Sequence, residues 1–164
     1  MTTRDKPIDV VFDCMIFLQA VANRKSLAAR LLDFVDTGEL RLFVSRQILK
    51  EVRDVLSRPE VRESLPGITD ESVEALFARL KKKATLMRKV PKTFDYSHRD
   101  PKDEPYINLA IAADANYLVS RDTDLLDLMR WDTEDGRGFQ RRFRGLRILD
   151  PLGFIKLVTK ETDV

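Results

Sequence analysis

Ile8-Asp9-Val10-Val11-Phe12-Asp13 is a short apolar run that ends in a carboxylate. A second apolar run, Tyr117-Leu118-Val119-Ser120, is followed two residues later by Asp122. Both runs are typical of buried strands. In an open parallel sheet, ligands bind just outside the carboxyl ends of the strands. We therefore expect Asp13 and Asp122 to lie at the same edge of one sheet.

Along the rest of the chain, strand-like runs alternate with helical patterns, which is typical of a parallel α/β fold. The predicted strands are residues 8–12, 40–44, 87–90, 117–120 and 146–149. Ser45 and Thr69 are predicted N-caps, and Gly38 is a predicted helix stop. Residues 131–144 are polar and contain glycines, so we predict a mobile loop there.

Composition is that of one globular domain, which we expect to span residues 1–164. The apolar share of 43% is ordinary, and no run is long enough to cross a membrane. Residues 1–6 are polar, and no apolar signal core follows them. The one cysteine, Cys14, cannot form an internal disulfide, which favours a reducing compartment and so a cytoplasmic location.

Basic residues are concentrated in two segments, although the net charge is only +2. Seven lie between Arg79 and Lys92, and five lie between Arg137 and Arg147, with no acidic residue in either segment. Segregated charge of this kind can present a basic face to a polyanion such as nucleic acid. The alternative is that both segments are ordinary solvated surface.

Acidic residues recur where helices are predicted to begin or to be buried. Glu51 lies at the edge of an apolar helical stripe, where its simpler role is to pair with Arg53 or Arg58. Asp103 and Glu104 open a later helix, where acids also interact favourably with the helix dipole. Asp13 and Asp124, in the same way, are candidates for helix capping.

Gathered at one edge of the sheet, such carboxylates would repel each other unless a cation lay among them. No group of histidines or cysteines accompanies them, and the single His98 is expected to be structural. Oxygen ligands alone select a hard cation, so the sequence predicts a site for Mg²⁺ or Mn²⁺ rather than Zn²⁺. Mg²⁺ held in this way commonly recruits phosphate oxygens, which indicates phosphodiester chemistry.

Taken in order, these motifs resemble the PIN domain family. They are Val10-Val11-Phe12-Asp13, Leu49-Lys50-Glu51-Val52, the segment from Asp100 to Tyr106, and the segment from Leu118 to Leu126. The last two are especially similar to the toxin components of toxin–antitoxin pairs. The resemblance covers roughly residues 8–156. It implies a three-layer α/β/α fold with a central parallel sheet of about five strands.

The resemblance also implies a Mg²⁺- or Mn²⁺-dependent endoribonuclease that hydrolyses RNA phosphodiester bonds. By position, the catalytic and metal-binding carboxylates would be Asp13, Glu51, Asp103 and Asp122. Asp124 would be an auxiliary ligand, Ser120 would orient a carboxylate, and Glu104 competes with Asp103 for its role. A toxin would have an antitoxin protein as its partner, and PIN domains often form homodimers. The residues expected to hold RNA are Lys81, Lys82, Lys83, Arg141 and Arg142.

One departure from the family pattern follows the first aspartate. Cys14 and Met15 stand where the family usually has Thr or Ser and then Asn. Loss of a hydrogen bond behind a metal ligand can lower affinity or activity on the order of 10–100-fold. The alternative function is therefore a weak or inactive PIN scaffold that binds RNA or a protein, although all four acids are present.

Overall fold

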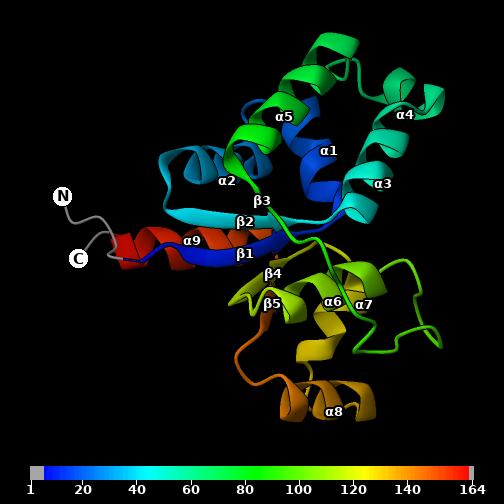
Figure 1. Ribbon diagram of the computed structural model, residues 1–164, viewed down its shortest axis with the longest axis vertical. Coiled ribbons are helices and arrows are strands. Elements are labelled where there is room, and N and C mark those ends of the chain that lie inside the picture. The colour runs from blue at the N-terminus through cyan, green and yellow to red at the C-terminus, as the bar shows by residue number, and fades with distance from the viewer. Residues whose placement is uncertain (1–5, 163–164) are drawn as a thin grey trace.

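The computed structural model describes residues 6–162, which fold around a five-stranded parallel sheet (Figure 1). Across the sheet the strand order is β3-β2-β1-β4-β5. The strands are β1 (Ile8–Phe12), β2 (Leu40–Val44), β3 (Thr85–Leu86), β4 (Tyr117–Val119) and β5 (Arg147–Leu149). Helices lie on both sides, so the predicted three-layer α/β/α class is confirmed. The polar amino-terminal segment, apart from Lys6, lies outside the described residues.

The helices divide between the two faces according to the strands they connect (Figure 1). One side carries α1 (Cys14–Ala22), α2 (Leu27–Thr37), α3 (Arg46–Leu56), α4 (Pro59–Ser64) and α5 (Asp70–Lys83). The other carries α6 (Glu104–Ala112), α7 (Thr123–Leu126), the 3₁₀ helix η1 (Asp127–Met129) and α8 (Glu134–Arg142). The last helix, α9 (Pro151–Thr162), packs against α2. Among these helices of residues 6–162, none has the length and apolar character to cross a membrane.

Strand register brings the ends of three strands to one level. In the centre of the sheet, Phe12 of β1 pairs with Val119 of β4. The ladder continues as the Asp13 N–H donates to the Val119 carbonyl at 3.1 Å, and the Ser120 N–H donates to Leu149 at 3.0 Å. Asp13 and Ser120 therefore lie side by side at the carboxyl edge of the sheet, where α/β proteins bind ligands.

Short polar signals set the helix boundaries, as the sequence predicts. Gly38 ends α2 with a φ of +87°, a left-handed conformation that favours glycine. Ser45 caps α3 by accepting the Ile48 N–H at 3.2 Å. Thr69 and Ser72 form a reciprocal capping box at the start of α5. These three predictions are confirmed.

The strand predicted at residues 87–90 is wrong, because the pairing lies earlier. Thr85 and Leu86 pair with Phe43 and Val44, the last two residues of β2. The Met87 N–H makes the final bond, to the Val44 carbonyl at 2.8 Å. Beyond this point β2 has already given way to α3, so residues 88–90 have no β2 residue to pair with.

The loop predicted at residues 131–144 is also wrong, because most of this segment is α8. Thr133 caps the helix by accepting the Gly136 N–H at 3.0 Å. Phe139 is fully buried, with its ring 5.2 Å from that of Phe94. A side chain at Gly136 would collide with the Arg130 carbonyl oxygen, 1.8 Å from where its Cβ would lie. Glycine at position 136 lets the start of α8 pack closely against the Arg130 backbone. In the sequence the same glycine suggested a loop.

Candidate metal centre

The four predicted metal ligands line one cavity of about 310 Å³ at the carboxyl edge of the sheet. Asp13 follows β1, Glu51 lies on α3, Asp103 precedes α6 and Asp122 precedes α7. Four elements that are distant in the sequence therefore direct acidic residues to one space. We call it the metal cavity. Its other lining residues are Cys14, Met15, Val55, Arg58, Lys102 and Tyr106.

Asp13 is 5% exposed and is held at both carboxylate oxygens. Its Oδ1 accepts the Ile16 N–H at 3.3 Å, so it does cap α1, and its Oδ2 accepts a short hydrogen bond from the Ser120 hydroxyl. Burial raises the pKa of Asp13 to about 6, and the hydrogen bond from Ser120 opposes this rise. The carboxylate is thus fixed in orientation but is costly to ionise without a compensating charge.

Asp103 is also buried, with 7% exposure, but it lacks such support. Although it occupies the N-cap position of α6, its side chain makes no capping hydrogen bond. Its Oδ2 atom is buried and has no hydrogen-bond partner within residues 6–162. Burial, followed by the nearby carboxylates of Asp122 and Asp100, raises the pKa of Asp103 to about 8. This is the least satisfied carboxylate of the cavity.

Four aspartates form what we call the acid cluster, namely Asp100, Asp103, Asp122 and Asp124. Each offers a carboxylate oxygen, and these oxygens all lie within 4.8 Å of one another. Ser120 links this cluster to Asp13, because its hydroxyl also accepts the Asp122 N–H at 2.9 Å. A divalent cation fits this donor set, since hard cations prefer several oxygen ligands.

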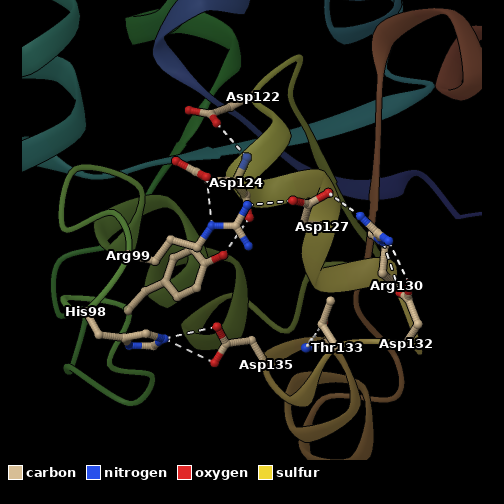
Figure 2. Close-up of polar contacts among 11 residues, drawn as sticks. His98, Arg99, Asp122, Asp124, Asp127, Arg130, Asp132, Thr133 and Asp135 are labelled. Carbon is tan, nitrogen blue, oxygen red and sulfur yellow. Dashed lines mark hydrogen bonds and ion pairs between the residues drawn. The ribbon is translucent and has the colours of Figure 1, made fainter.

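Asp122 and Asp124 differ in what surrounds their side chains (Figure 2). Asp122 caps α7, accepting the Asp124 N–H at 2.8 Å. The Asp124 carboxylate instead accepts the Arg99 Nε–H at 2.8 Å, and Arg99 also donates to Asp127 at 2.5 Å (Figure 2). Asp124 therefore shares its charge with a fixed arginine, whereas the Asp122 side chain faces the metal cavity.

Glu51 lines the metal cavity but does not belong to the acid cluster, and it has its own support. The Tyr106 hydroxyl donates to Glu51 Oε1 at 2.6 Å. The suggested pairing of Glu51 with Arg53 is not what the structure has, because Arg53 bonds Glu74 at 2.7 Å. Tyr106 was not anticipated from the sequence. Its position three residues after Asp103 is the signal, because that spacing shares one face of a helix.

Glu104 points to a different part of the molecule. Its Oε2 accepts the Tyr96 N–H at 3.0 Å, and its Oε1 lies 3.4 Å from the Lys92 ammonium. Asp103 lines the metal cavity, and Glu104 does not. Glu104 thus anchors the segment that leads into α6.

Three cavity residues that the sequence did not single out as ligands, Cys14, Arg58 and Lys102, add to its chemistry. Burial, and then the charge of Glu51, raise the pKa of the Cys14 thiol to about 12, so it is neutral near pH 7. The anionic donors of the cavity are therefore carboxylates.

Arg58 and Lys102 also line the cavity and supply the positive charge that phosphate groups need. His98 lies apart and contacts Asp135 at 3.0 Å (Figure 2).

The residues predicted to hold RNA lie on opposite sides of the sheet. Lys81, Lys82 and Lys83 are exposed at the end of α5. Arg141 and Arg142 lie at the end of α8, on the other face (Figure 1). The Arg141 guanidinium lies 5.3 Å from the Trp131 ring, and Arg142 donates to the Thr93 carbonyl at 3.3 Å. The structure does not bring the two groups together.

The sequence of this chain matches a known protein family over the segment that carries the four predicted ligands. A family model described as PIN domain matches residues 9–124, well over half of the chain, and this segment includes all four predicted ligands. A search of curated proteins finds no match. PIN domains are generally nucleases that use divalent metal ions, and the acid cluster could hold such an ion. The chain belongs to the PIN domain family.

Proposed function

We propose that this protein is a Mg²⁺- or Mn²⁺-dependent endoribonuclease whose ion is held by Asp13, Asp103 and Asp122, with Glu51 in the lining of the same cavity. The observation that carries the proposal is the buried Oδ2 atom of Asp103, which lacks a partner within the described residues. Buried polar atoms are normally paired, because leaving one unpaired costs free energy. A cation among the carboxylates would be that partner.

When bound, a divalent ion activates water and neutralises charge on the scissile phosphate. The chain supplies the positioning. Ser120 fixes Asp13 and Asp122 relative to each other, and Tyr106 fixes Glu51. Arg58 and Lys102 would hold the phosphates next to the scissile one. Attack by water at phosphorus would leave a 5′-phosphate and a 3′-hydroxyl. Asp124, shared with Arg99, would act through a water molecule.

The unusual Cys14-Met15 pair is compatible with an active enzyme. Asp13 is already oriented by the Ser120 hydroxyl and by the Ile16 N–H, so no side chain at position 14 or 15 is needed for it. This favours the enzyme over the alternative of an inactive PIN scaffold that binds RNA or a protein. A scaffold would bind RNA without any carboxylate-dependent binding of Mn²⁺.

We extend the proposal to a cytoplasmic toxin of a toxin–antitoxin pair. The support is the similarity of the segments 100–106 and 118–126 to such toxins. A small antitoxin protein would cover the metal cavity, and a second copy of the chain is the other proposed partner. Co-expression with the product of the neighbouring reading frame, followed by light scattering, tests both partners. A chain that remains a free monomer would contradict them.

The central test compares two substitutions on α3. Glu51→Gln removes one charge from the metal cavity, whereas Asp54→Asn removes one from the exposed surface of the same helix. We expect the first to weaken Mn²⁺ binding in calorimetry and to abolish Mn²⁺-dependent cleavage of single-stranded RNA. The second should change neither. Equal behaviour of the two variants would refute the proposed centre.

A further inference from the structure

A second cavity, of about 490 Å³, lies beside the edge strand β5 and shares no lining residue with the metal cavity. It runs between β5 and α8, and we call it the β5 groove. The residues that matter for its chemistry are Trp131, Arg141, Arg144, Arg147 and Leu149. The proposed function so far assigns nothing to this groove as a whole.

The charge of the β5 groove has a single sign. Three arginines line it, and among the residues that the structure describes no acidic residue does. Arg141, Arg144 and Arg147 are all exposed, and within residues 6–162 none of their guanidinium groups lies within 4.0 Å of a carboxylate. Such a surface complements a phosphate backbone, because arginine guanidinium groups bind phosphate oxygens in pairs.

Trp131 gives the β5 groove an aromatic surface. It is the only tryptophan of the chain, and it remains 54% exposed although the Arg141 guanidinium lies 5.3 Å from its ring. Large aromatic side chains usually bury most of their surface. An exposed ring among arginines is the combination that binds single-stranded nucleic acid, by stacking bases while cations hold the backbone.

One end of the β5 groove lies at the carboxyl edge of the sheet, as the metal cavity does. Its lining includes Leu149, whose carbonyl accepts the Ser120 N–H at 3.0 Å. Ser120 in turn donates to Asp13. From this end the groove extends along β5 to Arg147, which pairs with Tyr117 at the start of β4. The groove and the metal cavity are therefore linked through the paired ends of β4 and β5.

We propose that the β5 groove binds a single-stranded segment of the RNA substrate beside the segment held at the metal cavity. This rests on the proposed ribonuclease function. Trp131 stacks on a base, and Arg141, Arg144 and Arg147 contact its flanking phosphates. The absence of acidic residues in the lining favours RNA over a protein segment, whose backbone would carry no such regular negative charge.

Because Trp131 is the only tryptophan, its fluorescence reports on this groove. A single-stranded oligouridine is titrated into the full chain in EDTA, so that no cleavage occurs. We expect quenching that weakens as salt increases. Arg144→Gln should reduce the slope of log affinity against log salt by roughly 0.7. Arg30→Gln, an equal loss of charge at an exposed site on α2 outside both basic segments, should leave quenching unchanged.

Two substitutions of the ring separate stacking from folding. Trp131→Ala should weaken oligouridine binding about 10-fold, and Trp131→Phe should retain most of it. The affinities of these variants are measured by anisotropy of a labelled oligouridine. Equal affinity of wild type and Trp131→Ala would overturn the proposal. So would quenching by an acidic peptide but not by RNA, which would assign the groove to a protein partner.

The groove and the metal centre fail independently in this design. Asp122→Asn should abolish cleavage in Mn²⁺ while leaving Trp131 quenching intact. Cleavage by the wild type without any quenching would overturn the groove and leave the ribonuclease standing. Quenching by RNA in a wild-type protein that never cleaves it would overturn the ribonuclease and leave the groove standing.

Discussion

Asp103→Asn should make the metal-free protein more stable, although it removes a proposed ligand. Asp103 is buried within 4.8 Å of the carboxylate oxygens of three other aspartates, and one of its oxygens has no partner within residues 6–162. At this separation and an effective dielectric constant of about 20, one pair of like charges repels by about 3 kcal/mol. Asparagine has nearly the same shape and no charge, so we expect it to recover about this free energy of unfolding.

The gain should depend on pH with a definite sign. The pKa of Asp103 is raised from its ordinary 3.8 to about 8 in the folded protein. Between these values the folded state binds more protons than the unfolded state, so the stability of the wild type falls as pH rises. The advantage of Asp103→Asn should therefore be near zero below pH 4 and largest above about pH 8.

Thermal unfolding in EDTA measures this effect. For a domain of this size, about 3 kcal/mol corresponds to a rise in Tm of about 6–12 °C, expected at pH 8.5 and absent near pH 4. Addition of Mn²⁺ at 100 times its Kd should raise the free energy of unfolding of the wild type by about 2.7 kcal/mol, and its Tm should rise accordingly. The same addition should barely change the Tm of the variant. The surface variant Asp54→Asn should follow the wild type throughout. A metal-free Asp103→Asn protein that is less stable than the wild type at pH 8.5 would refute the reasoning.

Three further substitutions test the supports of the site and fold. Ser120→Ala removes a hydrogen bond that lowers the pKa of Asp13. The Mn²⁺ affinity should therefore fall about 10–100-fold, and the pH midpoint of Mn²⁺ binding should move upward. Calorimetry at several pH values measures both, and an unchanged midpoint would contradict the role of Ser120. Tyr106→Phe frees Glu51 while keeping the buried ring, and should lower RNA cleavage about 10-fold with an unchanged circular dichroism spectrum; full activity would count against it. Phe139→Ala should cost about 3–5 kcal/mol in urea denaturation, because its ring is fully buried, whereas a negligible loss would contradict a packed α8.

The sequence predicted the central strands β1 and β4 well because their residues are largely buried. Val10, Val11 and Leu118 are fully inaccessible, so β1 and β4 stand out as continuous apolar runs. Strand-end acids then followed from topology alone, since parallel strands share a carboxyl edge. The residues at which a strand begins and ends were not predictable in this way. β3 consists of Thr85 and Leu86 because of where β2 ends, a fact located in another part of the chain.

Site chemistry was predictable in its ligands but not in the residues that support them. An acid at a helix start looks the same in the sequence whether it caps the helix or faces a cavity. Asp103 and Glu104 are adjacent, yet Asp103 lines the metal cavity and Glu104 bonds the Tyr96 N–H. Only the direction of each side chain at the start of α6 separates them. Tyr106 and Arg99 escaped notice because each contacts a carboxylate on another element.

The two basic segments show why charge in the sequence is a weak guide to a binding face. They looked equivalent in the sequence, but α5 and α8, which carry them, lie on opposite sides of the sheet (Figure 1). The first segment is also partly neutralised, because Arg79 bonds Asp36 at 2.6 Å and approaches Asp33. Three arginines of the second line a cavity together with the exposed Trp131 ring, and that cavity reaches Leu149, which pairs with Ser120. If charge alone governed RNA affinity, loss of Lys82 and loss of Arg144 would weaken binding equally. Because stacking and a shaped groove accompany only the second segment, Arg144 should matter more.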